Sequence, residues 1–246
     1  MDSQPELLVS GRVTPTLIAQ LSDPHLRLDD QVSQDAFAAG VARVLTLNPL
    51  PAAVLVTGDI ANSGDPAEHA LALELLAPLP MPVHRLAGNH DLFGERTRYT
   101  VDARGVRIVA CDTSIPGRDD GTLEVDWLAE RLAEDRESPT IVAMHHPPLT
   151  TGLPWLDEIG HTPENTAALA DLLRAAPNVK RVVAGHVHRV IHDTLGGVGV
   201  ITCASTNIQS GLDFIATDMV LTTEPPSILV HVLLDSGELV THVQPT

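Results

Sequence analysis

The sequence is poor in several residue types that particular kinds of chemistry need. Its 246 residues include one lysine, Lys180, so neither a Schiff-base lysine nor the phosphate-binding lysine of a P-loop is expected. The two cysteines, Cys111 and Cys203, lie far apart in apolar runs and indicate buried free thiols rather than a disulfide framework. Aromatic residues make up only 2% of the chain, so we expect an aliphatic core.

Basic residues are also few. Lysine and arginine total 15 against 32 aspartates and glutamates, which gives a formal net charge of -17. Such a charge repels nucleic-acid backbones and anionic membranes, so we expect a small-molecule substrate and neither a nucleic-acid polymer nor a membrane as partner. The sequence has no run of 18 apolar residues and no signal-peptide pattern, and we expect a cytoplasmic protein.

The order of apolar segments predicts an α/β fold. We expect residues 1–246 to form one domain, with a loose N-terminal tail at 1–14 and a mainly β region at 189–246. Strands are expected at 16–21, 54–57, 83–87, 106–110, 140–144, 181–184, 190–194, 198–203, 228–234 and 239–243, and helices at 33–45, 66–77, 125–132 and 162–175.

Five of these strands end in polar clusters: Asp23 and His25, Asp59, Asn89 and His90, His145 and His146, and His186 and His188. Each cluster alone has an ordinary interpretation as a turn, a helix cap or a loop pair. Their recurrence places the side chains along one edge of one sheet, where open α/β sheets bind ligands. Mixed imidazole and carboxylate ligands suit divalent zinc, manganese, iron or cobalt.

The candidate ligands are too many for one metal ion and predict two ions that share a carboxylate. Asp59, at the end of the buried strand that begins at Val54, is the candidate bridge. Two such ions lower the pKa of a bound water and hold the attacking and leaving oxygens of a displacement, so phosphoester hydrolysis is predicted. The candidate ligands are Asp23, His25, Asp59, Asn89, His145, His186 and His188.

The ordered motifs resemble those of the calcineurin-like metallophosphoesterase superfamily. They are Asp23-x-His25, Gly58-Asp59, Gly88-Asn89-His90-Asp91, His145-His146-Pro147-Pro148 and Gly185-His186-x-His188. The resemblance implies a four-layer α/β/β/α sandwich. It also implies two metal sites, one formed by Asp23, His25, Asp59 and His188 and the other by Asp59, Asn89, His145 and His186.

The same resemblance implies roles for three residues beside the ligands. His90 would contact the phosphate and protonate the leaving alkoxide, and Asp91 would orient the His90 ring. For His146, a supporting role behind the ligands and a purely structural role both remain open.

Further segments resemble the bacterial class III cyclic nucleotide phosphodiesterases: Asp112-Thr113-Ser114, residues 203–209 and Glu224-Pro225-Pro226. This resemblance implies hydrolysis of a small phosphodiester, with 3',5'-cyclic nucleotides such as cyclic AMP the first candidates, by a metal-bound hydroxide. It also implies a homodimer. A glycerophosphodiesterase or broad phosphoesterase of the same fold is the alternative, and a scaffold that binds other proteins is a third.

Substrate contacts have weaker signals. Asn62 resembles the substrate-contacting asparagine of related glycerophosphodiesterases, but a turn residue before Gly64 would look the same. Asn89 and His90 would face the substrate as well as the metal site. Thr206 and Asn207 fit either substrate contacts or ordinary polar loop residues, and the segment 211–223 has no predicted role.

Overall fold

The computed structural model describes residues 14–91 and 98–246, so residues 1–13 of the predicted tail lie outside the described residues. The first of its two large sheets has the strand order β13-β12-β1-β2-β3. Its strands are β1 (Thr16–Leu21), β2 (Ala53–Thr57), β3 (Val83–Leu86), β12 (Ser227–Leu233) and β13 (Leu239–Pro245). Strands β1, β2 and β3 run parallel, and β12 and β13 are added antiparallel.

The second sheet has the strand order β4-β5-β6-β7-β9-β8. Its strands are β4 (Tyr99–Ala103), β5 (Val106–Ala110), β6 (Thr140–Ala143), β7 (Val179–Ala184), β8 (His192–Leu195) and β9 (Val198–Thr202). The four inner strands are parallel and both edge strands are antiparallel. A short ladder of β10 (Gln209–Ser210) and β11 (Leu221–Thr222) stands apart from both sheets.

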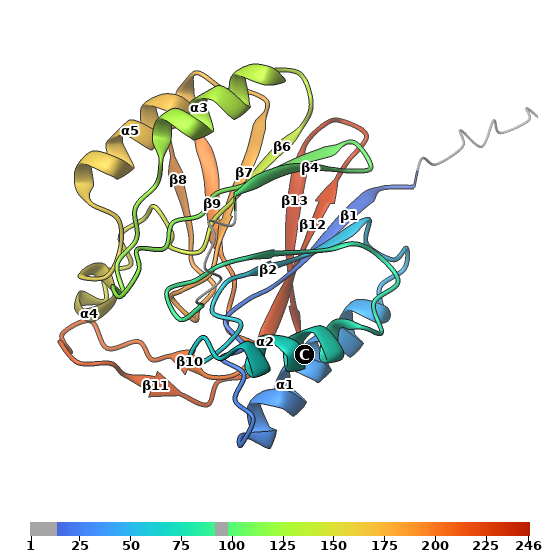
Figure 1. Ribbon diagram of the computed structural model, residues 1–246. Helices are drawn as coiled ribbons and strands as arrows, with labels where there is room; N and C mark the ends of the chain where they lie inside the picture. The colour runs from blue at the N-terminus through green and yellow to red at the C-terminus, as the bar shows by residue number, and fades with distance from the viewer. Residues whose placement is uncertain (1–13, 92–97) are drawn as a thin grey trace, which may run out of the picture.

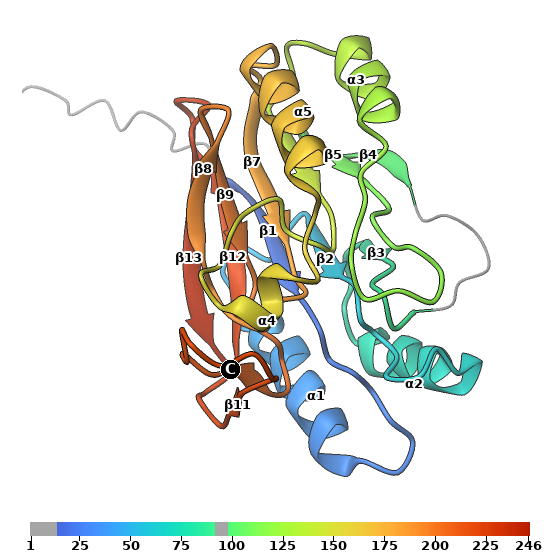
Figure 2. The same ribbon diagram turned by 90° about the vertical axis from the view of Figure 1, so that its left-hand side faces the viewer.

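Four helices cover the outer faces of the two sheets. Helices α1 (Gln31–Leu45) and α2 (Pro66–Leu76) pack on the first sheet, and α3 (Val125–Glu134) and α5 (Pro163–Arg174) pack on the second. A third apolar cluster, which includes Ile18, Leu55, Ile108 and Ile141, fills the space between the sheets. The predicted four-layer α/β/β/α sandwich is therefore confirmed, with the two helix pairs on opposite sides (Figures 1 and 2).

The starts of α2 and α5 follow from local capping. The Asp65 side chain accepts a hydrogen bond from Ala67 N at 2.8 Å and Pro66 takes the first helical position, as the sequence predicts. Thr162 caps α5 in the same way, with Pro163 as its first residue. Capping thus fixes where α2 and α5 leave the loops that precede them.

Some elements were not expected from the sequence. Strand β4 was missed, although Tyr99, Val101 and Ala103 alternate with more exposed residues. Helix α4 (Pro154–Asp157) is a single turn, too short to give a periodic pattern. Among the described residues, no helix combines the length and apolarity needed to cross a bilayer.

Candidate metal centre

The predicted ligands meet where the two sheets face each other at the carboxyl ends of their strands. Strands β1, β2 and β3 carry the loops with Asp23, His25, Asp59 and Asn89, whereas β6 and β7 carry the loops with the other histidines. The prediction that one sheet edge gathers all the ligands is therefore wrong. The chain leaves the first sheet after β3 and begins a second sheet at β4. The pattern of apolar residues in the strands does not show which strands share a sheet.

Most of the ligand loops turn through an uncommon backbone conformation. Asp23, His25, Asp59, His186 and His188 have φ between 44° and 68°. This left-handed region costs an L-residue roughly 1 kcal/mol or more, and it persists where the surrounding structure requires it. Arg104 is the one other non-glycine residue with positive φ in the described part of the chain, so this conformation is concentrated at the candidate ligands.

Two glycines allow the ligand loops to approach one another. A Cβ on Gly88 would lie 2.2 Å from Asp59 Oδ1, and one on Gly185 would lie 2.1 Å from Ser22 Oγ and 2.6 Å from Asp23 Oδ2. Any side chain at these positions would push the loops apart. The glycines that precede Asn89 and His186 are thus part of the site's construction.

The first group of candidate ligands is Asp23, His25, Asp59 and His188, whose ligand atoms all lie within 4.8 Å of one another. His25 Nε2 lies 3.0 Å from His188 Nε2 and 3.4 Å from Asp59 Oδ2. The other ring nitrogen of His188, Nδ1, lies 2.9 Å from Ile208 O and donates a hydrogen bond to it. The lone pair of the ring is therefore on Nε2, the atom that faces the other candidate ligands. The Asp23 carboxylate accepts the His186 backbone N–H at 3.0 Å.

The second group is Asn89, His145 and His186, with Asp59 between it and the first. His145 Nδ1 lies 2.8 Å from Thr57 O and donates to it, so Nε2 faces Asn89 Oδ1 at 3.1 Å and Asp59 Oδ2 at 3.5 Å. His186 Nε2 is buried and has no hydrogen-bond partner among the described residues, as a nitrogen reserved for a cation would be. Asp59 Oδ2 thus contacts ring nitrogens of both groups.

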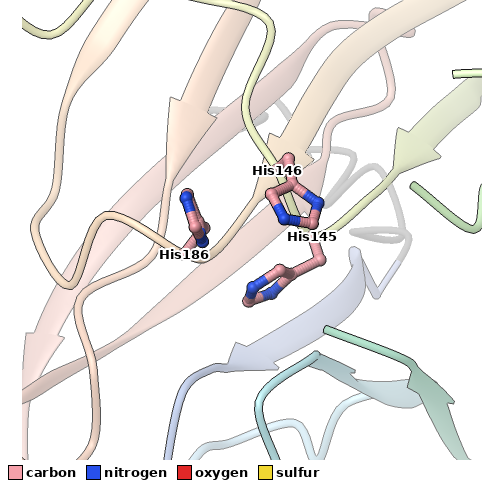
Figure 3. Close-up of side chains that lie close together, drawn as sticks. All are labelled: His145, His146 and His186. Carbon is pink, nitrogen blue, oxygen red and sulfur yellow. The ribbon is translucent and has the colours of Figure 1, made fainter. Parts of the chain in front are cut away.

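His146 also lies in this histidine cluster, beside His145 and His186 (Figure 3). Both nitrogens of its ring are already engaged: Nδ1 lies 2.9 Å from Thr113 Oγ1 and Nε2 lies 3.2 Å from Asp119 O. The ring therefore has no lone pair to offer an ion. Its contacts join the loop of residues 113–119 to the loop after β6 that carries His145.

The buried charges of the site are coupled. Burial lowers the pKa of His25 to about 3, although the Asp59 carboxylate raises it. Burial also lowers the pKa of His145, but the Asp59 and Asp23 carboxylates outweigh it and raise that pKa to about 9. The Asp59 carboxylate thus favours positive charge beside it, and the nitrogen and oxygen donors that surround it suit divalent transition metals.

Comparison with known proteins identifies the family of this chain. A model of the calcineurin-like phosphoesterase family matches residues 16–190. The chain belongs to this family. It is similar to a glycerophosphodiester phosphodiesterase from Enterobacter lignolyticus, with 32% identity over 87% of this chain and 86% of that protein.

This phosphoesterase is also similar to a second curated protein and to a solved structure. A 3',5'-cyclic adenosine monophosphate phosphodiesterase from Pseudomonas aeruginosa is 32% identical over 78% of this chain and 77% of that protein. The crystal structure of a dimetal phosphatase from Danio rerio superposes with a TM-score of 0.70 and 14% identity, covering 94% of this chain and 100% of that one. The last similarity shows a shared fold.

The phosphoesterase holds His90 differently from the prediction. His90 Nδ1 lies 2.7 Å from the main-chain oxygen of Asn62. The Asp91 carboxylate instead accepts the backbone N–H groups of Ile60, Ala61 and Gly88 at 2.9–3.1 Å. The prediction that Asp91 orients the His90 ring is therefore wrong, because the Asp91 carboxylate hydrogen-bonds to the backbone of the loops after β2 and β3 instead.

The candidate substrate contacts have different outcomes. Thr206 is fully buried, and its methyl group faces Gly40 of α1, so the predicted substrate contact is wrong. Asn207 is half-buried, and its Nδ2 lies 3.5 Å from Pro24 O beside the first ligand loop. Asn62 contacts His90 through its main-chain carbonyl, and no sequence motif predicts such a contact.

A cleft of about 340 Å³ opens above the candidate ligands. Its polar floor consists of His25, Asp59, Asn89, His90, His186 and His188. Its other lining residues are Asp119, Trp155, Leu156, Ile159, Ser210, Met219 and Leu221. The volume is typical of a small-molecule site.

Proposed function

We propose that this protein is a dinuclear metal-dependent phosphodiesterase that hydrolyses a small diester, with 3',5'-cyclic nucleotides as the first substrates to test. The observation that carries the proposal is the position of Asp59, whose Oδ2 lies 3.4 Å from His25 Nε2 and 3.5 Å from His145 Nε2. One carboxylate between two groups of donors suits a pair of ions.

The proposed metal ligands come from both sheets. Asp23, His25, Asp59 and His188 would hold one ion, and Asp59, Asn89, His145 and His186 would hold the other. Bound divalent ions would supply Lewis acidity to the phosphoryl group and to a water nucleophile. The orphaned Nε2 of His186 and the carbonyl-anchored rings of His145 and His188 support this assignment.

His90 is the proposed general acid. The Asn62 carbonyl accepts Nδ1–H in both the neutral ring and the imidazolium, so Nε2 is the atom that gains or releases a proton. His90 lines the cleft, where this atom can serve the leaving alkoxide of a diester. Asp91 supports it indirectly by fixing the loops on either side.

A glycerophosphodiesterase is the second candidate, because the similar protein from Enterobacter lignolyticus carries that name. A protein-binding scaffold is less consistent with the proposed ligand set. We further propose that the protein works in the cytoplasm, since its two cysteines are free and buried, and that it forms a homodimer, which sedimentation velocity would detect.

The test compares substrates on protein loaded with manganese, zinc, iron or cobalt in turn. We expect faster turnover of bis(p-nitrophenyl) phosphate than of p-nitrophenyl phosphate, since the first is a diester and the second a monoester. A preference for the monoester would refute the diesterase proposal. Parallel assays on cyclic AMP and glycerophosphoethanolamine then separate the two candidate substrates.

A further inference from the structure

The cleft above the candidate metal centre has one wall that the proposed hydrolysis does not use. Apart from Asp119 and Ser210, the lining side chains outside the polar floor are apolar. They come from helix α4 and the turn after it, and from the hairpin of residues 209–222. These residues, called the apolar wall below, are Trp155, Leu156, Ile159, Met219 and Leu221.

The α4 part of the wall is anchored to the ligand loop after β7. Trp155 and Leu156 are buried in a small apolar cluster with Val187, the residue between His186 and His188. The loop before α4 is fixed as well, since Asp157 accepts hydrogen bonds from Thr151 N at 2.7 Å and Gly152 N at 3.0 Å. This part of the wall thus has a defined position relative to the candidate ligands.

The hairpin part is tied to the same ligand loop by other contacts. Ser210 N donates to His188 O at 3.2 Å, and Arg189 Nη1 donates to Ser210 O at 2.9 Å and to the Glu224 carboxylate at 2.8 Å. Short pairing of β10 with β11 closes the base of the hairpin. Both ribbon views show this hairpin beside α4 (Figures 1 and 2).

Met219 and Leu221 reach the cleft yet remain 65% and 45% exposed, so the hairpin leaves apolar surface for an occupant to cover. Among the described lining residues outside the polar floor, Asp119 is the one that carries a charge, and its negative charge disfavours an anionic occupant of this wall. A neutral, apolar group therefore fits the wall, and the aromatic ring of a base is such a group, while a phosphate fits the floor.

We propose that the apolar wall binds a flat aromatic group of the substrate, such as a purine base, and so favours nucleotide diesters over diesters of small hydrophilic alcohols. This inference rests on the proposed function, because it takes the polar floor as the phosphate site. Met219 is the most exposed side chain of the apolar wall among those given above, so we assign it as the residue that determines this specificity. It contacts the organic group and takes no part in holding the ions.

The test is equilibrium binding to manganese-loaded protein of two probes that share a phosphate and a ribose. The probes are adenosine 5'-monophosphate and ribose 5-phosphate, which differ by the adenine base. We expect the first to bind about fivefold more tightly, as covering about 40 Å² of apolar surface would give. Met219→Ser should reduce this ratio to below about twofold, with ribose 5-phosphate affinity and metal content unchanged.

Ile215→Ser is the matched control, because Ile215 lies in the same hairpin, is 88% exposed and does not line the cleft. It should leave the ratio as in the unmodified protein. Equal affinities for the two probes, or a ratio that Met219→Ser does not change, would overturn the inference. Turnover of cyclic AMP and bis(p-nitrophenyl) phosphate is measured separately. A failure of the diesterase proposal is therefore distinguishable from a failure of the apolar wall to bind the base.

Discussion

The two sheets contribute different chemistry to the candidate metal centre. The loops of the first sheet supply both carboxylates, the Asn89 amide and His25, whereas the loops of the second supply only imidazoles. Each proposed ion would therefore need donors from both sheets. A metal ion bound there would link the two sheets. The affinity of the site for the ion would therefore depend on how the two sheets pack against each other.

The packing between the sheets includes a buried polar tie close to the centre. Gln20 Nε2 in β1 donates to Thr57 Oγ1 at 2.9 Å and to Ala184 O of the second sheet at 3.0 Å. Its Oε1 meets His231 Nε2 at 3.0 Å. Since these groups are fully buried, breaking any of these hydrogen bonds leaves an unsatisfied polar atom, which costs about 1–3 kcal/mol.

The largest effect should come from the carboxylate that joins the two groups. Asp59→Asn should remove bound metal and lower kcat/KM by at least about a thousandfold, since the neutral amide removes the negative charge that both groups share and replaces one donor oxygen with an NH2 group. His90→Ala is the contrasting variant, expected to keep both ions and lose about 10²–10⁴-fold in rate. Metal analysis beside kinetics separates them, and an Asp59→Asn protein with full metal content would contradict the bridging role.

Metal removal should loosen the attachment between the sheets. At a free metal concentration 100 times Kd, binding stabilises the folded state by about 2.7 kcal/mol, so a chelator should lower Tm by several degrees. Differential scanning calorimetry with and without chelator measures this. The Asp59→Asn protein should show little response, and an equal response in both proteins would place the stabilising ion elsewhere.

Gly185→Ala should separate the two sheets at one point. The new Cβ would lie 2.1 Å from Ser22 Oγ, and overpacking of this kind costs about 1–3 kcal/mol. Gly160→Ala is the control, because its Cβ would meet nothing closer than 3.7 Å. Urea unfolding of the metal-free proteins is the measurement, and equal loss of stability in both variants would argue against the close approach.

The smallest effect is a pH dependence from the polar tie. Burial lowers the pKa of His231 from 6.5 to about 3, so between these values the unfolded chain binds a proton that the folded chain does not. Stability should therefore fall as pH falls, by about 1.4 kcal/mol per unit from this group.

His231→Gln removes this term while keeping a polar side chain. The difference in unfolding free energy between the two proteins, measured by urea at pH 7 and pH 5.5, should shift by about 1–1.5 kcal/mol. All other titrating groups are common to both proteins and cancel. An unchanged difference would mean that His231 is protonated in the folded state.

The four layers could be predicted from the sequence because its ordered motifs resemble those of the calcineurin-like superfamily, and the candidate ligands could be named because imidazole and carboxylate side chains at strand ends are visible in it. It could not predict contacts made by the main chain, such as the Asn62 carbonyl against His90. Nor could it show that Thr206 would be covered by α1 at Gly40, since that depends on a helix distant in the chain. The apolar wall was missed because one turn of helix and two-residue strands have no periodic signal.

Val187 bears on how the selectivity of this phosphoesterase can be altered by engineering. Because Val187 separates His186 from His188 and packs with Trp155 and Leu156, changes in α4 will be transmitted to the ligand loop. Met219 lies on a hairpin whose tip contributes little to the folded core. Directed evolution of new substrate ranges should therefore begin with a library over residues 212–221 and leave α4 unchanged.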